Sequence, residues 1–183
     1  MEVPRLPRRV EGEPGAAGLA GELAARARLL WPGGELRVAQ AEVGPAIAAA
    51  LKAAHSAGQI VRGLEEAERV LSAEERGLQR VDRRTGVERG GRVSRLLVLA
   101  DDGAERFYRS VESLVRRHAP RILALRLTAD ERGLGQLLFG PDRVARLLLV
   151  EHKDAVSAIL LALAAQWAAE RADPGGNAAS DRG

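Results

Sequence analysis

The chain has 183 residues, which is enough for one hydrophobic core of ordinary size, with extensions or an insertion left over. It has no cysteine, and this excludes both a disulfide framework and a metal site built from thiolates. The formal net charge is +3, and arginine supplies nearly all the positive charge because Lys52 and Lys153 are the only lysines. A nucleic-acid partner is therefore allowed but not required.

Both ends of the chain have the composition of disordered segments. Residues 1–20 are rich in Pro, Gly, Ala and Arg without apolar periodicity, and residues 172–183 are similar. We predict that both are disordered tails around a main domain at residues 45–171. Residues 21–44 form a small extension to which the sequence assigns no role, although Leu36 and Val38 alternate as in a strand.

The main domain is predicted to begin with a helix at Pro45, because proline suits the first turn of a helix. Gly58 is placed where a left-handed residue would end this helix, and residues 59–62 then form a short strand. A second helix starts at about Leu64 and runs to Leu71 or a few residues beyond.

Three strand–helix pairs follow. The apolar runs at residues 96–100, 122–127 and 144–150 are each short enough to be a buried strand. Asp102 is predicted to cap the helix after the first run, and Thr128 to cap the helix after the second, with the carboxylates of Glu105 and Glu131 at the matching capping-box positions. The last helix runs from Asp154 to about Ala169, with its apolar residues on one side.

Residues 72–95 interrupt this regular order with a segment of seven arginines and four acids. A connection of this length inside a compact domain is uncommon, and it is either functional or disordered. One interpretation is a hairpin with its turn at Thr85 and Gly86, which would place Arg80, Arg83, Arg84 and Arg89 on an exposed arm. The other interpretation is a solvated, partly disordered loop.

Strands that alternate with helices predict an α/β fold, a three-layer α-β-α sandwich around a mixed sheet of about four strands. The order and spacing of the segments resemble the L-seven-Ae and L-thirty-e superfamily of ribosomal and RNA-binding proteins, most closely its bacterial YlxQ-like branch. The resemblance runs from Ile47 to Leu163 and rests on four stretches: "IAAALKAAHSAGQIVRGLEEAERVL", "RLLVLADD", "LTADERGLGQLLFG" and "RLLLVEHKDAVSAIL".

This resemblance implies a non-catalytic protein that binds kinked, structured RNA, with ribosomal RNA and ribosomal proteins as expected partners. The family's contact motif begins at the position of Gly63, and Glu66 and Arg69 match it in type. Glu65 replaces the family's asparagine, and Glu68 stands where threonine is usual. Because a helix N-terminus offers free N–H groups to a phosphate turn, the motif makes physical sense as an RNA contact.

We assign the RNA-binding surface on this basis to residues of three regions. They are Gly63, Glu65, Glu66 and Arg69 at the helix start, Arg80, Arg83 and Arg84 in the insertion, and Leu127 and Thr128 after the third strand.

The glutamates of the motif leave a second interpretation open. Glu65 and Glu68 are also ordinary first-turn glutamates that favour the helix dipole. The alternative function is a degenerate copy of the fold that acts as a protein-interaction module, in which the acidic face of Glu65, Glu66 and Glu68 meets a basic partner.

No catalytic or metal site is predicted. Asp101 and Asp102 follow a buried strand, but no third aspartate follows the next one, so a helix cap is the preferred interpretation. The three histidines are scattered, and no glycine-rich phosphate loop lies between a strand and a helix. We therefore expect a cytoplasmic monomer that is not an enzyme, has no cofactor or metal, and does not span a membrane.

Overall fold

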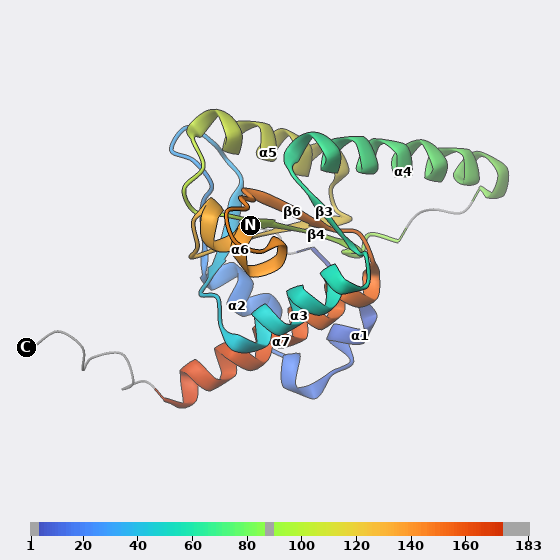
Figure 1. Ribbon diagram of the computed structural model, residues 1–183. Coiled ribbons are helices and arrows are strands. Elements are labelled where there is room, and N and C mark those ends of the chain that lie inside the picture. The colour runs from blue at the N-terminus through green and yellow to red at the C-terminus, as the bar shows by residue number, and fades with distance from the viewer. Residues whose placement is uncertain (1–3, 87–89, 174–183) are drawn as a thin grey trace, which may run out of the picture.

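The computed structural model describes residues 4–86 and 90–173 of the chain. The fold is α/β, with one mixed sheet of six strands in the order β1-β2-β5-β4-β6-β3 and helices on both of its faces (Figure 1). The strands are β1 (Ala27–Leu29), β2 (Arg37–Ala41), β3 (Ile60–Arg62), β4 (Arg95–Leu99), β5 (Ile122–Leu127) and β6 (Leu147–Val150). The helices are α1 (Arg8–Glu11), η1 (Pro14–Ala16), α2 (Leu19–Ala25), α3 (Pro45–Ser56), α4 (Leu64–Thr85), α5 (Glu105–His118), α6 (Glu131–Phe139) and α7 (Lys153–Ala172).

The four strands expected from the sequence lie in this one sheet, as predicted. β4 pairs with β5 in parallel and with β6 in antiparallel orientation, and β3 pairs antiparallel with the far side of β6. β4 is a central strand, and the side chains from Leu96 to Leu99 are fully buried. The strand predicted at residues 144–150 begins only at Leu147, because Val144 lies outside the sheet and is 48% exposed.

The expectation of about four strands was too low, because the extension at residues 21–44 adds two more. β2 pairs in parallel with β5, from Ala39 opposite Leu125 to Ala41 opposite Leu127, and β1 pairs antiparallel with β2. The extension therefore completes one side of the sheet.

Two groups of buried side chains hold the helices to the two faces of the sheet. On one face, α3 and α7 pack side by side with the N-terminal helices and α6, and Trp167 is fully buried there. On the other face, α4 and α5 pack through side chains such as Leu71 and Val111. Both faces of the central strands are thus covered, which explains why these strands appear as continuous apolar runs.

The prediction of a disordered tail at residues 1–20 was wrong for the part that the structure describes. Leu6, Val10 and Leu19 are buried in the core beside α7, and α1, η1 and the start of α2 lie within this segment. Three apolar side chains among many prolines and glycines have no helical period, so the sequence pattern gave no sign of burial. Residues 1–3, and residues 174–183 of the predicted C-terminal tail, lie outside the described residues.

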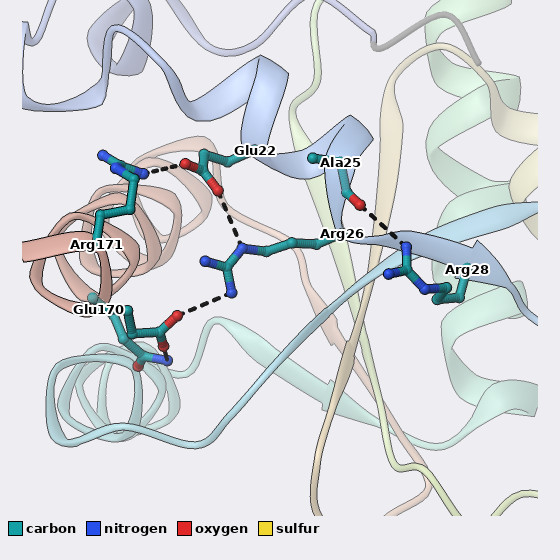
Figure 2. Close-up of polar contacts among 7 residues, drawn as sticks. Glu22, Ala25, Arg26, Arg28, Glu170 and Arg171 are labelled. Carbon is teal, nitrogen blue, oxygen red and sulfur yellow. Dashed lines mark hydrogen bonds and ion pairs between the residues drawn. The ribbon is translucent and has the colours of Figure 1, made fainter. Parts of the chain in front are cut away.

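Ion pairs and hydrogen bonds connect the end of α2 to the end of α7 (Figure 2). Arg26 bonds to Glu22 at 3.2 Å and to Glu170 of α7 at 2.9 Å, and Arg171 of α7 bonds to Glu22. The Arg26 guanidinium group also lies 4.5 Å from the centre of the Trp167 ring. Apart from the Arg26–Glu22 pair, the network joins residues more than 140 positions apart, so these partners could not be paired from the sequence.

The loop from Trp31 to Leu36, between β1 and β2, is held by one carboxylate of α5. Glu112, only 6% exposed, accepts hydrogen bonds from Trp31 Nε1 at 2.5 Å and from the backbone N–H groups of Glu35 and Leu36 at 3.0 and 3.1 Å. Arg116 forms an ion pair with it at 2.7 Å. This buried acid fixes where the chain turns into β2.

The insertion predicted at residues 72–95 is mostly helix, and the hairpin interpretation was wrong. α4 continues without a break to Thr85, and Gly86, with φ 63°, takes the left-handed conformation that ends it. The segment is rich in Glu, Ala, Leu, Gln and Arg and has one glycine, Gly77, before its end, so helix propensity decides its conformation. The loop interpretation is also wrong up to Thr85, and residues 87–89 lie outside the described residues.

Both predicted capping boxes were wrong. The residue before α5 is Ala104, which makes no side-chain cap, and Asp102 Oδ1 instead accepts a hydrogen bond from the Glu131 backbone N–H at the start of α6. α6 is capped by Asp130, whose side chain accepts from the Gly133 N–H at 2.7 Å, and not by Thr128.

In the described part of the chain, no helix combines the length and the apolar character that crossing a bilayer requires.

Candidate functional site

The carboxyl ends of β2, β3, β4 and β5 meet at one edge of the sheet. β3 and β4 both run antiparallel to β6, and β4, β5 and β2 are parallel to one another. Gly63, Asp101 and Thr128, which follow β3, β4 and β5, therefore lie along this edge. With strands about 4.8 Å apart, Gly63 and Thr128 are separated by three strand spacings, or roughly 14 Å.

Gly63 connects β3 to α4 in a conformation that other residues rarely adopt. Its φ and ψ angles are 94° and 153°, a region that is essentially restricted to glycine. Its N–H group donates to the Leu147 carbonyl at 2.9 Å, which holds the turn against β6. A side chain at this position would meet no atom within 4 Å, so the backbone angle, rather than crowding within the protein, requires glycine.

We therefore expect Gly63→Ala to lower the free energy of unfolding by about 1–3 kcal/mol, the usual cost of holding a non-glycine residue in such a region. Urea denaturation measures this difference. Gly77→Ala is the matched control, because Gly77 lies within a helix, has no positive φ, and has open space around it. Equal stability of the two variants would contradict the role of the Gly63 backbone.

No side chain caps the start of α4, so the first N–H groups of this helix have no side-chain acceptor. Glu66 and Arg69 bond to each other through both guanidinium and carboxylate atoms, with Arg69 Nε 3.0 Å from Glu66 Oε2. The Arg69 hydrogen bond lowers the pKa of Glu66. Glu68 pairs with Arg117 of α5 at 2.8 Å. Only Glu65, among the three acids of this turn, makes no hydrogen bond or ion pair with the described residues.

One face of α4 carries five arginines, which we call the arginine stripe. At about 100° per residue, they occupy an arc of roughly 100° that lies opposite the buried Ala67 and Leu71. The stripe consists of Arg69, Arg76, Arg80, Arg83 and Arg84, all exposed. At a rise of about 1.5 Å per residue, it is roughly 22 Å long.

The outer part of this helix reaches beyond the sheet, away from the body of the protein (Figure 1). Arg76, Arg80, Arg83 and Arg84 make no hydrogen bond or ion pair within residues 4–86 and 90–173. The last three of these arginines are identified as candidates from the sequence, but on a hairpin or a solvated loop rather than on a helix. Helical periodicity, continued past Leu71, is the signal that would have found the common face.

Leu127 and Thr128 differ in what they can contact. Leu127 is fully buried, so the prediction that its side chain belongs to a binding surface was wrong. Thr128 is exposed, and its N–H group donates to the Ala41 carbonyl at 2.9 Å, which fixes its position at the sheet edge. The structure places Thr128 and Gly63 at the same edge, whereas the arginine stripe extends from there along α4.

Within the described residues, the acids and histidines do not gather into a metal site. His55 packs edge-on against Phe139, and His152 accepts a hydrogen bond from the Asp154 N–H at the start of α7. His118 is buried, and burial lowers its pKa.

No family model matches the sequence, and no curated protein matches it either. Among solved structures, the chain is similar to one described as a protein with unknown function from Bacillus halodurans C. The similarity covers 65% of this chain and 96% of that chain, with 15% sequence identity and a TM-score of 0.42. Inferences about function therefore rest on the residues and contacts of this chain itself.

Proposed function

We propose that this protein is a non-catalytic RNA-binding protein of the L-seven-Ae type, which contacts structured RNA with the arginine stripe and with the start of α4 at Gly63. The observation that carries the proposal is the stripe itself. Four of its arginines are exposed on a projecting helix and have no acidic partner among the described residues. A three-layer fold of the L-thirty-e type and a site of action on ribosomal RNA are parts of the same proposal.

Arginine suits this role because its planar guanidinium group binds phosphate through two parallel hydrogen bonds and also stacks on bases. A stripe roughly 22 Å long can follow several successive phosphates of a folded RNA backbone. Neutralising these phosphates releases counterions, the dominant and sequence-independent source of affinity for nucleic acids. The stripe therefore accounts for affinity better than for the choice of sequence.

The start of α4 would supply the contact to a bend in the RNA. Its uncapped N–H groups and the positive end of the helix dipole favour a phosphate there. The charges of Glu66 and Glu68 are compensated by Arg69 and Arg117, so that only Glu65 presents an uncompensated negative charge in this turn. Glu65 is thus the one residue of the turn that opposes an RNA phosphate without a local partner.

We expect Glu65→Asn to tighten binding to a kink-turn RNA by roughly tenfold, because an amide can donate to base edges and carries no repelled charge. Electrophoretic mobility shifts with a kink-turn RNA and a plain duplex, at a stated salt concentration, measure the effect. Glu105→Asn is the control, since Glu105 is an exposed acid of another helix, near its start. Unchanged affinity of the Glu65 variant for both RNAs would contradict a contact at this turn.

The second candidate is a protein-interaction module, and one observation favours it. Glu65 shares the sheet edge with Asp101 and Asp102, so three exposed acids lie along this part of the edge, beside the exposed Arg62 and Arg146. A basic partner protein would be attracted to it. Should Glu65→Asn weaken capture of a basic protein and leave RNA affinity unchanged, this alternative replaces RNA binding at the edge.

A further inference from the structure

A cavity of about 410 Å³ lies at the edge of the sheet opposite to Gly63, where β2 and β5 begin. The two strands are paired only from Ala39 and Leu125 onward. The cavity is lined by Arg37 at the start of β2 and by Leu123 near the start of β5. These two residues stand opposite each other but are not paired in the sheet. Neighbouring parallel strands therefore separate at this end, and the cavity occupies the gap between them.

The lining of the cavity comes from both faces of the sheet. Leu23 and Ala39 belong to the core on the α7 side, whereas Val115 and Ile122 belong to the core on the α5 side. A pocket on one face of a closed sheet would draw its walls from one side only. The cavity thus opens into the sheet itself, and its walls are mainly apolar.

Two charged side chains of the described residues line the cavity, and both are arginines. Arg37 is exposed and makes no hydrogen bond or ion pair with the described residues. Arg5 is also exposed, and it makes no direct ion pair with the described residues because Glu11, the acid near it, is bonded to Arg92. Among the residues that the structure describes, no acidic side chain lines the cavity. An occupant that carries one negative charge and is otherwise apolar would match this arrangement.

We propose that the cavity binds a small apolar carboxylate, whose hydrocarbon part lies between β2 and β5 and whose carboxylate group meets Arg37 and Arg5. The volume is in the range of sites for small organic ligands, about 300–1,000 Å³, which are typically apolar with a few polar groups that fix orientation. A guanidinium group binds a planar carboxylate through two hydrogen bonds. This site is separate from the proposed RNA surface, so the two proposals can fail independently.

Isothermal titration calorimetry with octanoate tests the proposal, and 1-octanol is the neutral probe of the same length. We expect octanoate to bind the wild-type chain with a dissociation constant below about 1 mM, and octanol to bind at least about tenfold more weakly. No detectable binding of octanoate, or equal affinity for the two probes, would overturn the assignment.

Two variants locate the site. Arg37→Gln removes an exposed charge and is expected to weaken octanoate binding about tenfold, whereas Arg106→Gln, an exposed arginine of α5 outside the lining, should leave it unchanged. Ala124→Phe places a ring in the cavity and should abolish binding, once a thermal melt has shown that the variant folds. If Arg37→Gln binds octanoate as tightly as the wild type, the carboxylate is not held here and the proposal is wrong.

Discussion

Replacing Arg80, Arg83 and Arg84 together with alanine is expected to weaken the binding of structured RNA by about 10- to 100-fold at moderate salt. The three side chains lie on the exposed face of α4 and have no acidic partner within the described residues. Each is available for a phosphate, and each phosphate contact contributes about 0.7–0.9 to the dependence of log K on log salt concentration. The salt slope should therefore fall by roughly 2–3 units.

The measurement is a titration by fluorescence anisotropy with a kink-turn RNA and with a plain duplex, each at several salt concentrations. Because phosphate contacts carry no sequence information, we expect the triple variant to lose affinity for both RNAs to a similar extent. The Glu65→Asn effect, by contrast, should depend on the bent RNA. The two experiments thus separate the arginine stripe from the turn at Gly63.

A matched control is the triple variant Arg8→Ala, Arg9→Ala and Arg106→Ala, which removes the same charge from exposed positions on α1 and α5. Its salt slope should stay close to that of the wild type. An equal loss in both triple variants would mean that net charge alone, rather than the stripe, attracts the RNA. Full affinity in the α4 variant would remove the observation on which the proposed function depends.

Glu112→Ala is expected to lower the free energy of unfolding by about 3 kcal/mol, because it leaves the donors of the Trp31–Leu36 loop without their acceptor. The Glu35 and Leu36 N–H groups and Trp31 Nε1 all donate to this carboxylate, which is only 6% exposed. An added Cβ at Gly34 would come within 2.4 Å of the Glu112 carboxylate and of the Trp31 ring nitrogen, so the loop packs closely around this carboxylate. Urea denaturation at neutral pH measures the change.

The same variant makes a prediction about pH. Burial alone raises the pKa of Glu112, but the donors of Glu35, Trp31 and Leu36 and the charge of Arg116 lower it below its ordinary value of 4.5. A lowered folded-state pKa stabilises the folded protein above the unfolded-state pKa, and this contribution is lost as the pH falls through the folded-state value. The stability difference between wild type and Glu112→Ala should therefore shrink below about pH 4.5.

Glu105→Ala is the matched control for the stability measurement. Glu105 lies on the same helix and pairs with Arg109, but both side chains of that pair are more than half exposed. Exposed ion pairs contribute little, so this variant should stay close to the wild type in stability at both neutral and acid pH. A loss as large as that of Glu112→Ala would show that removing any acid from α5 has this effect, and would contradict the role of the Trp31–Leu36 loop.

The sequence alone determined the features that depend on local chemistry. The run from Leu96 to Leu99 is apolar at every position, which predicted a strand buried on both faces, and the structure confirms it. Pro45 and Gly58 mark the start of α3 and the left-handed residue after its end, where φ is 70°. These features are encoded within a few residues, because backbone angles and side-chain periodicity act over one or two turns of chain.

Only the tertiary structure decided which distant segments meet. Asp102 was predicted to cap its own helix but accepts from Glu131, 29 residues away, and Glu112 holds a loop about 80 residues earlier in the chain. β2 and β5 are paired at one end and apart at the other, which creates a cavity that neither strand indicates by itself. A carboxylate has the same local sequence whether it meets water or a distant N–H group. Its partner is therefore fixed only when the sheet brings the segments together.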